Sequence, residues 1–334
     1  MPIASSRVGI IGAGAIGTFI GARLARSGCS VTAFARGATA ASLRTHGFRL
    51  VQEGSLVTAP VSVVDDTNAL GPQDLVVIAV KGPSLAQVAD RVRPLLGPET
   101  VVLTAMNGVP WWFFEDGAGA CGGIRLESID PDGSIAVAIP VRHVIGCVVH
   151  ATCSVLEPGL VRHGFGNGLI IGEPGAGAAG PGTVSARVEA LAGLLRAAGF
   201  DITVSTRIQA DIWYKLWGNM TMNPISALTG ATCDRILDDP LLNRYTLAIM
   251  AEAAAIGAKI GCPITQSGED RNAVTRKLGA FKTSMLQDVE AGRPLEIDAL
   301  LTAVTEIGGR VGVPTPHTDA LLGLVRVFAE ARHG

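Results

Sequence analysis

The chain has 334 residues, of which 48% are hydrophobic and 17% charged, and its formal net charge is −2. This length favours two domains, and the apolar content excludes a disordered chain. The near-neutral charge argues against a nucleic-acid partner, because nucleic-acid binding relies on clustered cations.

The N-terminal part alternates short apolar runs with helical stretches, a pattern typical of a parallel sheet covered on both faces. In chain order we expect strands at 8–11, 30–35, 61–64, 74–80 and 100–105, with a helix at 15–27. Strand-like runs return over 144–173, and a helix capped by Ser185 and ended by Gly199 precedes a last strand around 202–204. The expected fold class is therefore α/β, with a Rossmann-like, doubly wound N-terminal domain.

Beyond Thr206 the sequence has helical periodicity and no credible strand. The expected helices cover 207–228, 241–260, 268–291 and 297–311, separated by breaks that contain Gly and Pro. We therefore predict two domains, a Rossmann-like domain over 1–205 and an all-helical domain over 206–334.

Cysteine spacing and hydropathy exclude further classes of site. The six cysteines form no C-x-x-C pair and have no nearby histidine at zinc-ligand spacing, so we expect no metal site. The apolar segment 8–22 is interrupted by glycines and is shorter than the roughly 18 residues that a membrane helix needs. We expect a cytoplasmic protein with no membrane partner.

A glycine-rich turn follows the first expected strand and opens the first helix. Its residues are Gly12, Ala13, Gly14, Ala15, Ile16 and Gly17. In a G-x-G-x-x-G turn the glycines allow a tight turn, close approach of a pyrophosphate and close packing of helix on strand. The helix N-terminus then faces the anion. This context predicts dinucleotide binding, with a purely structural turn as the alternative.

The end of the second expected strand bears on the choice of cofactor. An acidic residue there would bind the ribose 2′-hydroxyl of NAD, whereas this chain has Arg36 and no Asp or Glu between Gly17 and Glu53. An arginine can pair with a 2′-phosphate. The sequence therefore favours NADPH, unless Arg36 is simply solvated.

Two polar residues follow later strands. Lys81 comes directly after the run 74–80, and Asn107 follows the run 100–105 and precedes Gly108. The carboxyl ends of parallel strands are where ligands bind in open α/β sheets. We predict that both residues contact ligand; a surface cation at Lys81 and a left-handed turn at Asn107 are the alternatives.

The first helix of the second domain carries a polar stripe. Lys215, Asn219 and Asn223 stand at i, i+4 and i+8, so they share one helical face. Tryptophans and methionines surround them, and a lysine is costly to bury in such surroundings. One ammonium and two amides in line are suited to binding a carbonyl and neighbouring oxygens.

A second polar segment lies near the C-terminus. Ser284 stands near the end of an expected helix, and Glu296 opens the next one after a G-R-P break. An acidic residue in a first helical turn is also an ordinary complement to the helix dipole. The role of Glu296 is left open by this pattern alone.

Taken together, these motifs resemble those of the ketopantoate reductase (2-dehydropantoate 2-reductase) family. The matching residues, in family order, are Gly12 to Gly17, Arg36, Val80-Lys81-Gly82, Asn107-Gly108-Val109, Lys215 to Asn219, Asn223-Pro224, Ser284 to Asp288 and Glu296 to Asp298. The resemblance implies a Rossmann domain followed by a helical domain, with the active site in the cleft between them. It also implies an oxidoreductase that reduces 2-dehydropantoate to (R)-pantoate with NADPH, in pantothenate biosynthesis on the way to coenzyme A.

Residue roles follow from the same resemblance. It implies that Lys215 is the catalytic proton donor, with Glu296 beside it near the nicotinamide ribose. Substrate contacts fall on Asn107, Lys215, Asn219, Asn223 and Ser284. Cofactor contacts fall on the glycine turn, Arg36, Lys81, Asn107, Thr152 and Glu296.

Two departures from the family pattern bear on the substrate, a small 2-oxo acid. Cys233 stands where the family has a further substrate-contacting asparagine, and the region 111–144 is longer and different. A reductase of another 2-oxo acid is therefore the first alternative, and a non-catalytic regulator that senses NADPH is the second. The apolar helices of the second domain are compatible with a homodimer.

Overall fold

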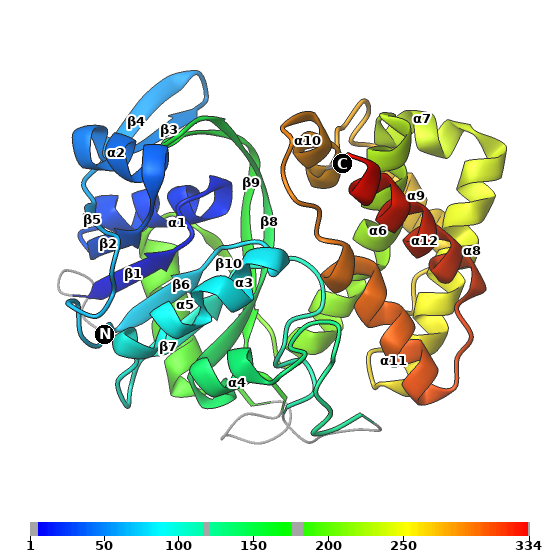
Figure 1. The fold of residues 1–334 in the computed structure, drawn as a ribbon, viewed down its shortest axis with the longest axis horizontal. Helices are drawn as coiled ribbons and strands as arrows, with labels where there is room; N and C mark the ends of the chain where they lie inside the picture. Colours follow the sequence, from blue (N-terminus) through cyan, green and yellow to red (C-terminus); the bar gives the residue numbers. More distant parts are fainter. Residues whose placement is uncertain (1–5, 116–120, 176–182, 333–334) are drawn as a thin grey trace. The chain divides into compact units, whose positions relative to one another are not determined.

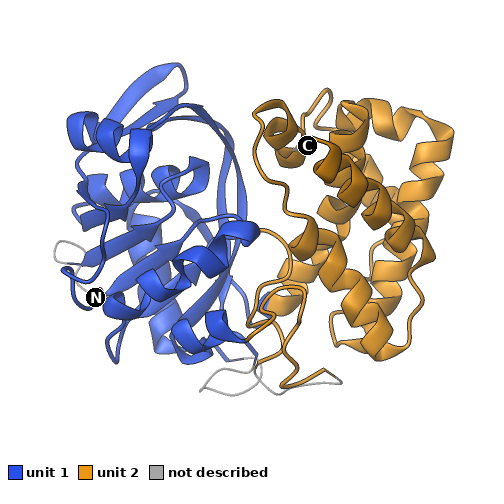
Figure 2. Cartoon of the chain, in the orientation of Figure 1, with its two compact units in different colours: residues 1–106, 133–208 blue, residues 107–132, 209–334 orange. Residues whose placement is uncertain are grey.

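The chain divides into two compact units, which Figure 2 colours separately. The computed structural model describes residues 6–115, 121–175 and 183–332. Unit 1 comprises residues 1–106 and 133–208, and unit 2 comprises 107–132 and 209–334. The expected division at 205/206 lies close to the boundary at 208/209. The segment 107–132, which that division assigned to the first domain, groups with the helical unit instead.

Unit 1 is built on a ten-stranded mixed sheet, and Figure 1 labels its strands. The strand order is β4-β3-β9-β8-β7-β6-β1-β2-β5, and β10 pairs with β9. Strands β8, β7, β6, β1, β2 and β5 are parallel to one another. The strands are β1 (Arg7–Ile11), β2 (Ser30–Phe34), β3 (Phe48–Gln52), β4 (Ser55–Ala59), β5 (Ser62–Val64), β6 (Leu75–Ile78), β7 (Val101–Thr104), β8 (Val144–Glu157), β9 (Leu160–Gly172) and β10 (Asp201–Val204). This confirms the Rossmann-like sheet.

Helices pack on both faces of this sheet. They are α1 (Ala15–Arg26), α2 (Gly37–His46), α3 (Gly82–Val88), α4 (Ser134–Ala138) and α5 (Ala186–Ala197), with 3₁₀ turns η2 (Ala89–Arg91), η3 (Arg93–Leu95) and η4 (Val141–His143). Val8 and Ile10 of β1 share one core with Phe19 of α1 and Leu191 of α5. Ile11 is equally buried but lies outside that core, because successive strand residues point to opposite faces.

Every described regular element of unit 2 is helical, as expected. The elements are α6 (Ile208–Thr229), α7 (Cys233–Asp238), α8 (Pro240–Lys259), α9 (Gly268–Arg276), α10 (Ser284–Glu290), the π-helical turn η5 (Asp298–Thr302), α11 (Ala303–Val311) and α12 (Pro316–Ala331). The single helix expected over 268–291 is wrong. Gly279 has a φ of +63°, and Thr283 starts a new helix by accepting a hydrogen bond from the amide of Leu286. Within the described residues, no helix combines the length and hydropathy needed to cross a bilayer.

Candidate active site

Two glycines of the turn between β1 and α1 are required by the backbone itself. Gly12 has a φ of +98°, and a Cβ there would lie 2.7 Å from a methyl carbon of Val80. A Cβ on Gly17 would lie 1.9 Å from the carbonyl oxygen of Gly12. Because no real Cβ approaches that closely, a side chain at Gly17 would force helix and strand apart.

Gly14 is different, since its surroundings do not require glycine. Its φ of −81° is open to any residue, and within the described residues no atom would lie within 4 Å of a Cβ there. Gly14 is also the N-cap of α1, where no side chain caps the helix and the first turn has no acidic residue. The N-terminus of α1, with the positive end of the helix dipole, therefore adjoins open space beside Gly14, which fits a phosphate group.

Two cations follow the strands that flank this turn. β2 and β6 both pair in parallel with β1, so their carboxyl ends share one edge of the sheet. Lys81 is the N-cap of α3 after β6 and is half-buried. Arg36 is the exposed N-cap of α2 after β2, with its guanidinium carbon 5.9 Å from the centre of the Phe34 ring. The exposure of Arg36 leaves it accessible to a phosphate.

Thr152 lies on β8 within the same unit. It pairs opposite Phe165 of β9, and the register of the two strands shifts on both sides of it. Its hydroxyl accepts a hydrogen bond of 2.8 Å from the amide of Phe165. Such irregularities re-aim backbone groups in a sheet.

In unit 2, two tryptophans fix the rotation of α6. The indole of Trp213 donates to the carbonyl of Ala253 at 3.1 Å, and that of Trp217 donates to the carbonyl of Met250 at 2.8 Å. Both acceptors belong to α8. Residues two positions apart on a helix point about 200° apart, so the tryptophans turn Lys215 and Asn219 away from α8.

Lys215 and Asn107, 108 residues apart in the sequence, are brought together. The ammonium Nζ of Lys215 donates a hydrogen bond of 2.8 Å to the Oδ1 of Asn107. Both residues belong to unit 2 and both are half-buried. The amide of Asn107 therefore orients the ammonium of Lys215.

Asn107 is itself fixed by the two residues that follow it. The amide of Val109 donates to the carbonyl of Ala299 at 2.9 Å, and a Cβ on Gly108 would lie 2.4 Å from that carbonyl oxygen. Gly108 has a φ of +76°, whereas Glu53 is the only non-glycine residue with a positive φ in the described chain. The left-handed turn is thus at Gly108, and that alternative for Asn107 is wrong.

The far end of the stripe meets the second polar segment. Asn223 is 6% exposed, and its Nδ2 donates to the hydroxyl of Ser284 over 3.4 Å. Ser284 is the exposed first residue of α10. Asn219 is half-buried and one helical turn from both Lys215 and Asn223.

Glu296 is also buried, at 7% exposure. It stands two residues before η5, whose Ala299 touches Gly108. A carboxylate that only complements a helix dipole at the surface would be solvated, so this burial argues against that alternative.

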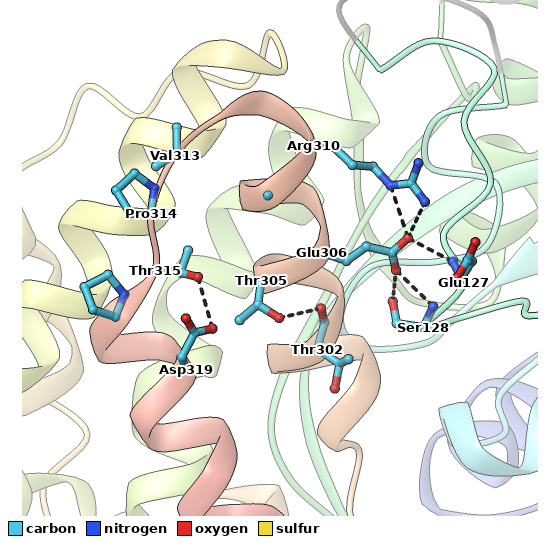
Figure 3. Close-up of a pocket in the computed structure, with 12 residues that line it drawn as sticks. Glu127, Ser128, Thr302, Thr305, Glu306, Arg310, Val313, Pro314, Thr315 and Asp319 are labelled. Atoms are coloured by element: carbon cyan, nitrogen blue, oxygen red, sulfur yellow. Dashed lines mark hydrogen bonds and ion pairs between the residues drawn. The ribbon is translucent and has the colours of Figure 1, made fainter.

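Sequence reasoning missed the residue that fastens the segment 107–132 to α11. The Glu306 carboxylate accepts hydrogen bonds from the amides of Glu127 and Ser128, at 3.0 and 2.9 Å, and from the Ser128 hydroxyl. Figure 3 marks these bonds. Arg310 pairs with the same carboxylate at 2.8 Å. Burial opposes ionisation of Glu306, but these hydrogen bonds outweigh it and hold its pKa below the ordinary value. No local sequence signal marks such a contact.

An open pocket lies beside this carboxylate (Figure 3). It is lined by Glu127, Ser128, Thr302, Thr305, Glu306, Gly309, Arg310, Val313, Pro314, Thr315, Pro316 and Asp319. None of the predicted site residues lines it, so it is separate from the polar stripe.

Cys233 is the first residue of α7 and is 2% exposed. Burial, followed by the nearby charge of Asp234, raises the pKa of its thiol to about 11. The thiol therefore stays protonated at neutral pH and is an unsuitable nucleophile.

A Rossmann-like unit with a glycine-rich turn at a helix N-terminus, joined to a helical unit with an oriented ammonium, is typical of oxidoreductases that use a nicotinamide cofactor. The family model of ketopantoate reductase PanE/ApbA matches residues 8–111, and that of the ketopantoate reductase PanE/ApbA C terminal matches residues 207–329. A 2-dehydropantoate 2-reductase from Mesorhizobium japonicum is 43% identical and covers 98% of each chain. The chain belongs to the ketopantoate reductase family of oxidoreductases.

Solved structures agree with this assignment. A candidate ketopantoate reductase from Ralstonia solanacearum is 58% identical, covers 98% of this chain and 99% of its own, and has a TM-score of 0.93. A D-mandelate dehydrogenase solved with NADH shares the fold at 22% identity, covering 98% and 100% of the two chains with a TM-score of 0.82.

Proposed function

We propose that this protein reduces 2-dehydropantoate to (R)-pantoate with NADPH, in pantothenate biosynthesis. The observation that carries the proposal is the 2.8 Å hydrogen bond between Lys215 and Asn107, on a helix that also presents Asn219 and Asn223. An ammonium oriented by an amide is suited to a ketone oxygen that becomes an alkoxide. The likeness to 2-dehydropantoate 2-reductases over nearly the whole chain supports this choice of substrate.

The cofactor proposal rests on unit 1. The uncapped amides at Gly14 and the open space beside it would hold the pyrophosphate. Arg36 would pair with the 2′-phosphate, and Lys81, Thr152, Asn107 and Glu296 would complete the cofactor contacts. Bound NADPH supplies the hydride for C2 of the substrate. The shared fold of the NADH-bound D-mandelate dehydrogenase supports a nicotinamide cofactor but does not distinguish NADPH from NADH.

The residues of unit 2 would perform the proton chemistry. Lys215 donates a proton to the oxygen on C2 as it gains negative charge, while Asn107 holds the ammonium in place. Asn219, Asn223 and Ser284 bind the remaining oxygens of the substrate, and Glu296 lies beside the lysine. General acid catalysis of this kind contributes about 10²- to 10⁴-fold to the rate.

Steady-state oxidation of NADPH against a panel of 2-oxo acids tests the proposal. We expect the highest kcat/KM with 2-dehydropantoate, and a loss of about 10²- to 10⁴-fold in kcat for Lys215→Ala, because the proton donor is gone. Lys259→Ala, an exposed lysine at the end of α8, is the matched control and should retain full activity. Near-normal kcat in Lys215→Ala would exclude the proposed role.

A second candidate, a reductase of another 2-oxo acid, is favoured by Cys233. A buried, protonated thiol offers a weaker hydrogen bond than the amide expected in the family. A higher kcat/KM for a less hydroxylated 2-oxo acid would select this candidate. Tight NADPH binding without turnover of any 2-oxo acid in the panel would exclude both reductase functions and favour the non-catalytic regulator that senses NADPH.

The choice between NADPH and NADH is tested at Arg36. Removing the guanidinium in Arg36→Ala takes away a charge-assisted contact to the 2′-phosphate, which is worth about 1.5–3 kcal/mol. We expect NADPH binding to weaken about 10- to 100-fold and NADH binding to change little, as measured by fluorescence titration. An equal effect on both cofactors would contradict the assignment.

A further inference from the structure

The guanidinium of Arg271 lies against the helix that carries Lys215. A Cβ added to Gly218 of α6 would lie 2.7 Å from Nη2, 3.1 Å from Cζ and 3.3 Å from Nε of Arg271. The Tyr214 ring, one turn earlier on α6, has its centre 5.7 Å from Cζ. Arg271 reaches this position from α9, and the absence of a side chain at Gly218 makes room for it.

This cation lacks the partners that a half-buried arginine normally has. Nη1 donates to the hydroxyl of Thr275 at 3.1 Å, and this is the only side-chain hydrogen bond that Arg271 makes within the described residues. The Nε atom is buried and has no hydrogen-bond partner within the described residues, whereas Nη2 is accessible to solvent. No carboxylate of the described chain pairs with Arg271. A buried donor without a partner destabilises a fold, so its presence requires an explanation.

Helix geometry places this charge beside the polar stripe. Lys215 and Gly218 are three residues apart, and side chains three or four apart on a helix are neighbours, with Cβ atoms about 5–6 Å apart. Asn219 directly follows Gly218. The guanidinium over Gly218 therefore flanks the face on which Lys215 and Asn219 stand.

We propose that Arg271 recognises the carboxylate of the 2-oxo acid. This inference rests on the proposed function, in which Lys215 acts on the C2 oxygen, because the carboxylate is bonded to that same carbon. A fixed guanidinium without a competing acidic partner has the charge and the donors that a carboxylate requires. Arg271 is then a specificity residue for anionic substrates.

Calorimetric binding of one 2-oxo acid and of its uncharged methyl ester, with NADP⁺ present, tests this assignment. We expect the wild type to bind the acid more tightly than the ester. Arg271→Gln should weaken binding of the acid about tenfold or more and that of the ester by much less. Arg271→Lys keeps the charge and should recover part of the preference for the acid.

Two further variants separate recognition from folding. Gly218→Ala leaves every charge in place but displaces the guanidinium, so it should reduce the same preference. Arg276→Gln removes another arginine of α9, one that pairs with Asp238 at an exposed site, and should bind both compounds as the wild type does. Circular dichroism of each variant verifies the fold.

The outcomes distinguish this inference from the proposed function. Equal affinity of the wild type for acid and ester, or an equal loss for both in Arg271→Gln, would overturn the role of Arg271. A protein that binds the acid through Arg271 but turns over no 2-oxo acid would refute the proposed reductase activity while retaining the inference.

Discussion

At the scale of single residues, substitution of Gly14 should impair cofactor binding, whereas substitution of Gly17 should impair stability. A Cβ on Gly14 meets no described atom within 4 Å, whereas one on Gly17 would overlap the carbonyl oxygen of Gly12. We expect Gly14→Ala to keep the thermal stability of the wild type and to lose NADPH affinity, because the added methyl group would occupy the space that we propose for the pyrophosphate.

Gly17→Ala should instead lower the melting temperature, since close packing of α1 on β1 is lost. Differential scanning calorimetry and fluorescence titration of both variants measure the two effects. If Gly14→Ala bound NADPH normally, the open space beside the turn would have no role in cofactor binding.

The residues of the candidate site show what local patterns can predict. Helical spacing was enough to place Lys215, Asn219 and Asn223 on one face, because that geometry is internal to a single helix. The hydrogen bond from Lys215 to Asn107 could not be predicted from spacing, since it joins residues 108 positions apart. The packing of Arg271 on Gly218 joins two helices and was missed for the same reason.

At the scale of elements, β1, β6 and β7 were predicted because each lies in a continuous apolar run of the sequence. The β3–β4 hairpin was missed, although a signal was present. Glu53 and Gly54 form its two-residue loop with positive φ values of 51° and 78°. Such loops match the twist of the flanking strands.

Two half-buried carboxylates connect separate elements of unit 2 and should make its stability depend on pH. Glu306 accepts hydrogen bonds from the segment 107–132, and Glu252 of α8 accepts them from the first turn of α12. Burial opposes their ionisation, but the hydrogen bonds outweigh it and hold the pKa of each below its ordinary value. A depressed pKa in the folded state stabilises the fold above the ordinary glutamate value of about 4.3, and this stabilisation is lost as the pH falls through the folded pKa.

We therefore expect Glu306→Gln and Glu252→Gln each to lower the free energy of unfolding at pH 7 by about 1–2 kcal/mol. The deficit should shrink as the pH is lowered below about 4.3, where the wild-type carboxylates also become protonated. Urea unfolding across this range measures it, with Glu330→Gln, an exposed carboxylate on α12, as the control. A deficit that stays constant with pH would mean that packing, and not ionisation, is responsible.

At the scale of the whole molecule, the chain passes between its two units three times, at 106/107, 132/133 and 208/209. The first two passages enclose a segment that lies early in the sequence but groups with the helical unit. The sequence pattern could not predict the grouping of this segment with unit 2, because an inserted segment follows the Rossmann-like domain without a break in the chain. Only long-range contacts show to which unit such a segment belongs. Asn107 is the first residue of this segment, 107–132, and its place in unit 2 brings it to Lys215.

The segment 107–132 also supplies part of the core of unit 2. Trp111, Trp112, Phe113 and Phe114 are 2%, 0%, 2% and 5% exposed, and the Phe113 ring lies 6.2 Å from that of Trp213 on α6. Burying a large apolar side chain stabilises a fold by about 1.5–3 kcal/mol. Four such residues contribute roughly as much as the ~5–15 kcal/mol that separates a folded domain from its unfolded chain.

A fragment of residues 209–334 should therefore not fold cooperatively by itself. It contains the described helices α7 to α12 and all of α6 except Ile208, but it lacks the segment 107–132. We expect this fragment to keep some helical signal in far-UV circular dichroism but to lose the near-UV signal of its packed tryptophans and to melt without a transition. Addition of a peptide spanning 107–132 should restore both, because it returns the aromatic core and the partners of Glu306. A scrambled peptide of the same composition is the control. Cooperative melting of the fragment by itself would show that its helices do not need the segment 107–132 in order to pack. The role of this segment would then be limited to placing Asn107 beside Lys215.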